Sequence, residues 1–122
     1  NILDAEIIKT SGYSIFRHDR KFKSGGGVAI LFKRCLRLRQ IEIPVEYSNL
    51  ELLVAELFSS TLTLRFIVCC RPPNASSEYN ETLLKSLTWA SCQDRLLIIT
   101  GDFNLIIIII IFISMLQHDT IL

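Results

Sequence analysis

Segments of apolar and β-prone residues recur through the first part of the chain, and their lengths predict short strands rather than helices. The run at 28–32 is apolar at every position, which predicts a buried strand. The segment 36–41 alternates apolar and charged residues, which is typical of a strand with one face in water. A hairpin is predicted at Ser59 and Ser60, between the segments 50–57 and 62–70. The predicted strands are 12–17, 28–32, 36–41, 50–57 and 62–70.

The pattern changes at Pro72–Pro73, which end the strand because proline has no N–H to donate. Ser76–Ser77 offer an N-cap and acidic residues follow in the first turn, so a helix is predicted from here to about Ala90. The apolar positions of this helix recur at helical spacing, at Tyr79, Leu83, Leu84 and Leu87.

A strand and a polar turn follow the helix. The strand is predicted over 95–100, and its exit turn, 101–104, reads Gly-Asp-Phe-Asn. A carboxylate and a carboxamide placed directly after an apolar strand are a common way to present polar chemistry at the edge of a sheet. Antiparallel strands followed by a helix and another strand indicate α/β layers rather than an all-β sandwich.

The last part of the chain is dominated by an isoleucine run from Ile106 to Ile111, followed by Phe112 and Ile113. This run is shorter than the roughly 20 apolar residues that a transmembrane helix needs, so no membrane span is expected. Identical β-branched residues also specify a strand poorly and favour aggregation. We therefore expect 106–122 to be a low-complexity tail that lies outside the fold.

Charge is distributed unevenly, although the formal net charge of the 122 residues is only +1. Between positions 17 and 39, basic residues are opposed only by Asp19. They are Arg17, Arg20, Lys21, Lys23, Lys33, Arg34, Arg37 and Arg39. This segment fits either a stripe that faces a phosphate backbone or a solvated loop and a charged strand edge.

Half of the residues are apolar, and the length allows one globular domain at most. The four cysteines show neither zinc-ligand spacing nor a disulfide framework, which favours reduced thiols in an intracellular protein. The chain begins with Asn1 and shows no signal peptide. We therefore expect a fragment whose start lies upstream, in a nuclear or cytoplasmic protein.

Several motifs occur in a characteristic order, at 12–20, 25–30, 50–51, 71–74 and 101–104. In this order they resemble the endonuclease/exonuclease/phosphatase superfamily. More narrowly, the chain from about Ile7 to Leu105 is similar to the apurinic-type endonuclease domain of non-LTR retrotransposons, which is fused to a reverse transcriptase.

The resemblance implies a fold class, an activity and partners. The fold would be a partial four-layer α/β sandwich, with two packed mixed β-sheets and outer helices, truncated at both ends and spanning 1–105. The activity would be cleavage of DNA phosphodiesters with a divalent metal, usually Mg²⁺, which polarises a phosphate oxygen. A reverse transcriptase domain would follow in an intact parent; no oligomeric state is implied.

The resemblance also implies site residues. Asp102 would act in proton transfer or near the metal, and Asn104 would hold the water or a phosphate oxygen by hydrogen bonds. The two side chains share one direction if the turn stays extended. Contacts with nucleic acid are expected at Arg17, Arg20, Arg71 and Asn74.

The chain also departs from the family. The motif with the metal-binding glutamate and the C-terminal Ser-Asp-His motif are absent, so no metal ligand is assigned, and Cys70 stands where the family often has a tyrosine. Two hypotheses follow: a fragment of a Mg²⁺-dependent DNA endonuclease domain, or a degenerate, non-catalytic remnant with at most weak nucleic-acid binding.

Three other features have plainer interpretations. A structural or edge role is favoured for Glu51 because it lies on an apolar strand. Glycines 25–27 are expected to serve a turn rather than a phosphate cradle, because no helix follows them. His18 is expected to be a solvated loop histidine.

Overall fold

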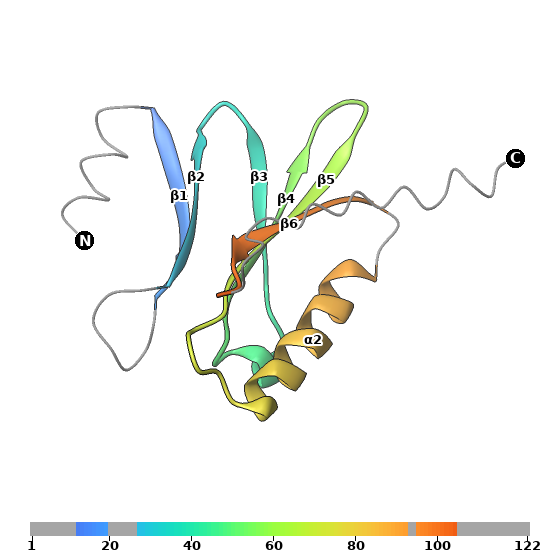
Figure 1. Cartoon of the computed structure of the whole chain (residues 1–122). Helices are drawn as coiled ribbons and strands as arrows, with labels where there is room; N and C mark the ends of the chain where they lie inside the picture. Colours follow the sequence, from blue (N-terminus) through green and yellow to red (C-terminus); the bar gives the residue numbers. More distant parts are fainter. Residues whose placement is uncertain (1–11, 20–26, 93–94, 105–122) are drawn as a thin grey trace, which may run out of the picture.

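A computed structural model describes residues 12–19, 27–92 and 95–104 (Figure 1). Every strand and the helix predicted within these ranges are confirmed. The elements are β1 (Tyr13–His18), β2 (Val28–Lys33), β3 (Arg37–Ile41), the 3-10 helix η1 (Val45–Tyr47), β4 (Glu51–Phe58), β5 (Thr63–Cys70), α2 (Ser77–Ser91) and β6 (Leu96–Asp102).

The strands form two sheets. β1 and β2 pair antiparallel, and the larger sheet has the order β3-β4-β5-β6, in which only the β5–β6 pair is parallel. α2 connects these two parallel strands, as a crossover must, since parallel neighbours cannot be joined by a tight hairpin. The predicted α/β class is therefore confirmed.

The larger sheet lies between two covering layers. On one face, Leu52, Val54 and Ile67 form a core with Leu83 and Ala90 of α2. The opposite face of the same sheet packs against β1 and β2. The described residues thus form a helix layer and two sheet layers (Figure 1).

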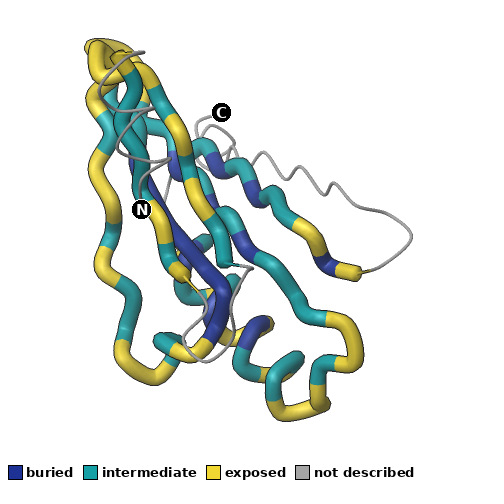
Figure 2. Tube along the Cα trace, turned by 90° about the vertical axis from the view of Figure 1, so that its left-hand side faces the viewer, coloured by how far each residue is buried: buried dark blue, intermediate teal, exposed yellow. Residues whose placement is uncertain are grey.

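The central strand β4 is buried on both faces, and it appears as a continuous dark segment in Figure 2. Leu52 and Val54 face α2, whereas Leu53 and Ala55 alternate with them and face β1 and β2; all four have no exposed surface. This strand is therefore the only described one in which both the odd and the even positions are withdrawn from water.

The sequence prediction of a buried strand at 28–32 is wrong. β2 alternates between half-buried and exposed positions, and Leu31 is 49% exposed. The apolar run suggested burial on both sides. Among the described residues, however, the two-stranded sheet is covered only on the face that carries Phe16 and Phe32, whose ring centroids lie 4.8 Å apart. The burial of β2 depends on whether its sheet is an inner or an outer layer of the fold. A run of apolar residues does not specify that position.

The helix begins and ends as the sequence indicates. The Ser76 side chain accepts a hydrogen bond from the backbone N–H of Tyr79 at 3.0 Å, which is the expected N-cap bond. The helix ends at Ser91, one residue beyond the predicted end near Ala90. It presents Leu83, Ser86 and Ala90 to the sheet as its buried positions.

A buried carboxylate joins the larger sheet to the end of the helix. Glu56 of β4 has no exposed surface, and its carboxylate contacts Arg39 of β3 at 3.1 Å, Arg65 of β5 at 3.0 Å and Arg95 at 2.7 Å. Arg65 also donates to the carbonyl of Ala90 at 2.8 Å, near the C-terminus of α2. A carboxylate can be buried at this depth only because several charged donors satisfy it.

Strand β6 continues to Asp102, two residues past the predicted end of the strand. Gly101 makes this possible. It has a φ of 149°, and a Cβ at this position would overlap the backbone carbonyl of Cys69 on the neighbouring strand. The absence of a side chain therefore lets β6 approach β5 closely just before Asp102.

The predicted tail at 106–122 and the domain boundary at 105 lie outside the described residues. Within the described ranges, α2 is too short and too polar to cross a membrane, and no other helix there meets the requirement.

The first prediction concerns the buried carboxylate. Replacing Glu56 with alanine should lower the free energy of unfolding by about 3–5 kcal/mol, because the change leaves a buried guanidinium without its counter-charge. Urea unfolding followed by circular dichroism measures the change. Glu46→Ala, at an exposed position of η1, serves as the control and should change stability by less than about 0.5 kcal/mol. A Glu56→Ala chain as stable as the control would contradict the structural role assigned to the carboxylate.

The second prediction concerns Gly101. Gly101→Ala should destabilise the chain by on the order of 3 kcal/mol, because it adds both backbone strain and overlap with β5. Gly12→Ala is a matched control: its φ of 71° is also unfavourable for alanine, but nothing lies within 4 Å of the new Cβ. Thermal unfolding of both variants should therefore place Gly101→Ala clearly below Gly12→Ala; equal losses would refute the steric explanation.

Candidate functional site

The strand register brings three residues into one row at the end of the larger sheet. Glu51 of β4 pairs with Cys70 of β5, which pairs with Asp102 of β6. Directly paired residues project to the same face of a sheet, here the face toward β1 and β2. Glu51 is buried, Cys70 is half-buried and Asp102 is exposed, so the row runs from the interior to the surface. We call these three residues the rim row.

The turn after β6 holds Asn104 against Asp102. The backbone N–H of Asn104 donates to Oδ1 of Asp102 at 2.9 Å. Asn104 has a φ of 54°, a left-handed conformation that asparagine adopts more readily than most residues. The turn is therefore not extended, and the condition under which the two side chains would share one direction is not met. Phe103 between them is buried in the core and fixes the turn to the sheet.

Arg71 fastens this turn to the segment after β5. Its backbone N–H donates to the carbonyl of Asp102 at 2.7 Å, and its guanidinium donates to the carbonyl of Phe103 at 3.3 Å. In return, the side-chain amide of Asn104 donates to the carbonyl of Arg71 at 2.6 Å. Arg71 also donates to Asn80 of α2 at 2.8 Å. The Arg-Pro-Pro-Asn and Gly-Asp-Phe-Asn motifs, far apart in the sequence, are thus in direct contact.

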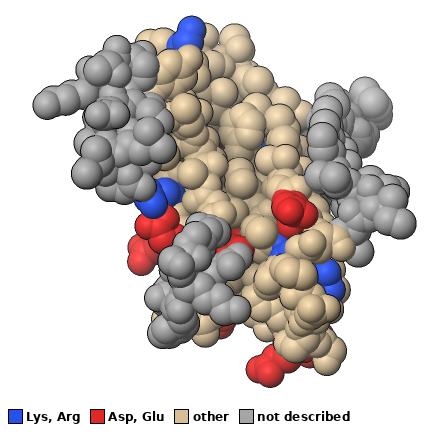
Figure 3. All heavy atoms as spheres, turned by 60° about the vertical axis from the view of Figure 1, so that its left-hand side comes forward, with Lys and Arg blue, Asp and Glu red and all other residues tan. Residues whose placement is uncertain are grey.

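The residues expected to contact nucleic acid do not form one group. Arg71 lies beside Asp102 and Asn104, as described above, and Asn74 occupies an exposed turn with a φ of 60°. Arg17 lies on the other sheet, where its guanidinium binds Asp19 at 2.8 Å. Arg20 lies outside the described residues. On the face shown in Figure 3, the described basic side chains lie apart from one another, with acidic side chains close to some of them.

The expectation that His18 is a solvated loop residue is wrong. His18 is the last residue of β1, is half-buried, and has its Nδ1 3.1 Å from the carbonyl oxygen of Leu52 on β4. A carbonyl oxygen only accepts, so this contact requires the proton on Nδ1; the tautomer that fits has its lone pair on Nε2. The alternation of Ser14, Phe16 and His18 along β1 was the available sign that this side chain faces inward.

Tyr79 supports the rim row from the helix side, a role that the sequence pattern did not indicate. Its hydroxyl accepts from the N–H of Glu51 at 3.4 Å and donates to the carbonyl of Cys70 at 3.3 Å. Burial raises the pKa of Tyr79, with the charge of Glu51 adding to the effect, so the hydroxyl keeps its proton at neutral pH. In the sequence, Tyr79 was recognised only as one apolar position of a helix.

The two adjacent cysteines differ in environment, because neighbouring strand residues point to opposite faces. Cys69 is buried in the core, and burial, with Cys70 as a smaller cause, raises its pKa to about 12. Its thiol therefore stays protonated at neutral pH and is not a nucleophile. Cys70 faces the opposite side and occupies the centre of the rim row.

The donor atoms at the rim are of the kind that hard cations prefer. Glu51 and Asp102 contribute carboxylates and Asn104 a carboxamide, but among the described residues no three histidine, cysteine or acidic side chains are close enough to hold a metal ion together. The described rim therefore fits a part of a magnesium shell and not a complete one.

The chain is similar to solved structures, but no protein-family profile and no curated protein sequence matches it. Among solved structures, the chain is similar to TDP2 of D. rerio, in a form humanised by 14 mutations, with a TM-score of 0.53 and 16% sequence identity. The similarity covers 84% of this chain and 47% of the TDP2 chain, so the present chain spans about half the length of that protein.

At this identity the likeness establishes the fold alone. The part of the fold that the described residues contribute is a mixed sheet, with a second sheet packed on one face and a helix on the other. The α/β arrangement predicted for the chain is therefore also present in a solved structure.

Proposed function

We propose that this chain is part of a Mg²⁺-dependent DNA endonuclease domain that hydrolyses phosphodiesters, of the kind found in non-LTR retrotransposons. The observation that carries the proposal is the rim row together with Asn104. The register of three strands and the clamp by Arg71 bring the carboxylates of Glu51 and Asp102 and the amide of Asn104 to one end of the sheet. The fold shared with TDP2 agrees with this assignment.

Asp102, Asn104 and Arg71 each have a role that their positions allow. Asp102 is exposed and has one oxygen oriented by the N–H of Asn104, so it can accept a proton from a water molecule or contact a metal ion. The amide nitrogen of Asn104 is held by the Arg71 carbonyl, so its amide oxygen points away from that carbonyl. Arg71 positions both residues through the bonds of its guanidinium to Phe103 and Asn80. These bonds use two of its five N–H donors, so contact of Arg71 with a phosphate stays part of the proposal.

Magnesium would enter this site through the carboxylates of Asp102 and Glu51, with further ligands from outside the described residues. When bound, Mg²⁺ supplies a Lewis acid that stabilises charge on the phosphate oxygens. In this proposal Asp102 takes a proton from the attacking water, and the amide oxygen of Asn104 holds that water or a phosphate oxygen. In this proposal the remaining parts of the domain, and a reverse transcriptase domain after it, belong to a longer parent protein in the nucleus or cytoplasm.

A second candidate function is a non-catalytic remnant that binds nucleic acid weakly. Cys70 favours this alternative because it occupies the centre of the rim row, where the family often has a tyrosine. A thiol is a weak hydrogen-bond donor and cannot replace a phenol hydroxyl against a phosphate. Under both candidates the present chain derives from the same kind of domain, and they differ in whether chemistry persists.

The third prediction follows from the incomplete ligand set. The isolated chain with Mg²⁺ and supercoiled plasmid should produce no more nicked DNA than its Asp102→Ala variant, because losing metal and general-base contributions each reduces rates by at least about a hundredfold. Asp19→Ala, which removes an exposed carboxylate on the other sheet, is the matched control. Nicking by the parent chain and by Asp19→Ala, but not by Asp102→Ala, would show that the chain is catalytically competent.

The fourth prediction concerns duplex DNA. Basic side chains that neutralise phosphates release counterions, so binding should be weak, independent of duplex sequence, and weaker as salt rises. A fluorescence-anisotropy titration at 50 and 200 mM salt measures the dependence. Binding whose affinity does not change with salt, or no binding at 50 mM salt, would contradict the prediction that the chain binds DNA.

A further inference from the structure

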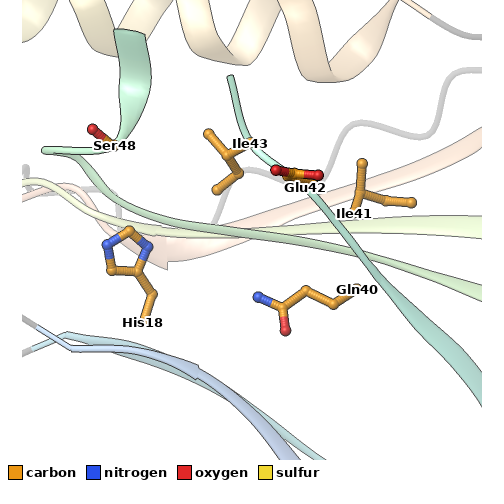
Figure 4. A pocket seen from close by; sticks show the side chains of 6 residues that line it. All are labelled: His18, Gln40, Ile41, Glu42, Ile43 and Ser48. Carbon is orange, nitrogen blue, oxygen red and sulfur yellow. The ribbon is translucent and has the colours of Figure 1, made fainter. Parts of the chain in front are cut away.

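A cavity of about 420 Å³ lies between the two sheets, at the edge formed by β3 and away from β6. Figure 4 shows its lining side chains, which come from the end of β1, from β3 with the segment that follows it, and from the residue after η1. They are His18, Gln40, Ile41, Glu42, Ile43 and Ser48. Cavities of this size accommodate small organic ligands, including a nucleobase with its sugar.

The wall of the cavity combines apolar and polar groups from the end of β3 and from the two residues that follow it. Ile41 and Ile43 are half-buried and pack against the core of the larger sheet. Gln40 and Glu42 are exposed, and Figure 4 shows the Gln40 side chain on the side of the β3 ribbon where His18 lies. All six residues line the same space, so a ligand in the cavity can contact isoleucine side chains and polar groups at the same time.

The polar groups of the cavity are mainly hydrogen-bond acceptors. Because Nδ1 of His18 donates to Leu52, the neutral ring offers the lone pair of Nε2. Glu42 adds a carboxylate, which only accepts, while Gln40 and Ser48 can donate or accept. The complementary ligand has a planar body and an edge with adjacent N–H donors.

Guanine has the Watson–Crick edge that fits this description best. Its N1–H and N2 amino group are adjacent donors that pair with a carboxylate through two parallel hydrogen bonds, whereas thymine presents one N–H between two carbonyl groups. Proteins that bind single strands read such edges because the bases are unpaired. In a duplex the same edge is occupied by the partner base.

The cavity lies on the same end of the larger sheet as the rim row. His18 contacts the carbonyl of Leu52, the residue next to Glu51. β3 and β6 are the two edges of this four-stranded sheet, so the cavity and Asp102 are separated by three strand spacings, about 14 Å in all. A short stretch of single-stranded DNA can span this distance.

We infer that the cavity binds a guanine base of a single-stranded DNA segment whose backbone passes the rim row, with Glu42 as the residue that selects the base. This inference deepens the proposed function and depends on it for the identity of the strand. The cavity itself is a separate claim, because a free nucleoside has no phosphate with which to contact the rim.

The experiment uses the full chain and three probes: guanosine, thymidine and a short single-stranded oligonucleotide that contains one guanine among thymines. The imidazole signals of His18 are followed by NMR, with His118→Gln used to assign them, since the chain has two histidines. Guanosine should shift the His18 signals and thymidine should not. Glu42→Gln should weaken guanosine binding at least about tenfold, the discrimination expected for one bidentate pair.

Glu46→Gln is the matched control, because Glu46 is an exposed acid on η1 that does not line the cavity. It should leave guanosine binding unchanged. Intermolecular NOEs between guanosine H8 and the Ile43 methyl groups of the unaltered chain give a second test that does not depend on the folding of any variant. Absence of both the shift and the NOEs, or an equal response to thymidine, would overturn the inference.

The oligonucleotide separates this inference from the proposed function. If guanosine shifts His18 but the oligonucleotide binds no more tightly than guanosine alone, the cavity assignment stands and the DNA assignment fails. If the oligonucleotide binds in a salt-dependent manner but guanosine has no effect, DNA binding stands and the guanine cavity is refuted.

Discussion

The buried carboxylate of Glu56 is the interaction on which the larger sheet depends most. It contacts arginines from β3, from β5 and from the entry to β6, and through Arg65 it is linked to the end of α2. Burying a carboxylate costs free energy unless charged donors bind it. The three arginines offset this cost only when the strands place them around Glu56. This requirement fixes the lateral order of strands at the end of the sheet opposite the rim row. The hydrophobic core alone does not specify that order, because one apolar side chain can often replace another.

The rim row results from backbone constraints more than from the side chains that compose it. The register of β4, β5 and β6 aligns Glu51, Cys70 and Asp102, and Gly101 permits the close approach that places Asp102 beside Cys70. Arg71 then holds the exit turn by main-chain and side-chain bonds. A site built in this way keeps its geometry even when one of its chemical groups is changed, which explains how a cysteine can stand at the centre of a well-formed row.

Local patterns in the sequence predicted the elements well, because strands and the helix carry their periodicity within a few residues. The N-cap at Ser76 and the break at the two prolines were visible for the same reason. Local sequence patterns did not predict the properties that depend on packing between elements. The exposure of β2, the inward position of His18 and the support of the rim row by Tyr79 all depend on contacts with segments distant in the sequence. The left-handed turn at Asn104 could not be predicted, because asparagine tolerates both the extended and the left-handed conformation; the shared direction of the two side chains was therefore conditional on an extended turn.

The position of β6 at the edge of its sheet affects how the site responds to thermal fluctuation. β4 and β5 are joined by a short hairpin, whereas β6 reaches β5 only after the whole of α2, so its pairing closes a much longer loop. Like β3 at the other edge, β6 is paired with one described strand only, and the last residues of β6 are its least buried part. Opening of this strand end removes Asp102 and Asn104 from the rim while β4 and β5 remain paired. The candidate site is therefore lost in a local opening that requires less free energy than unfolding of the chain, and hydrogen exchange at its amides reports on the site rather than on the fold.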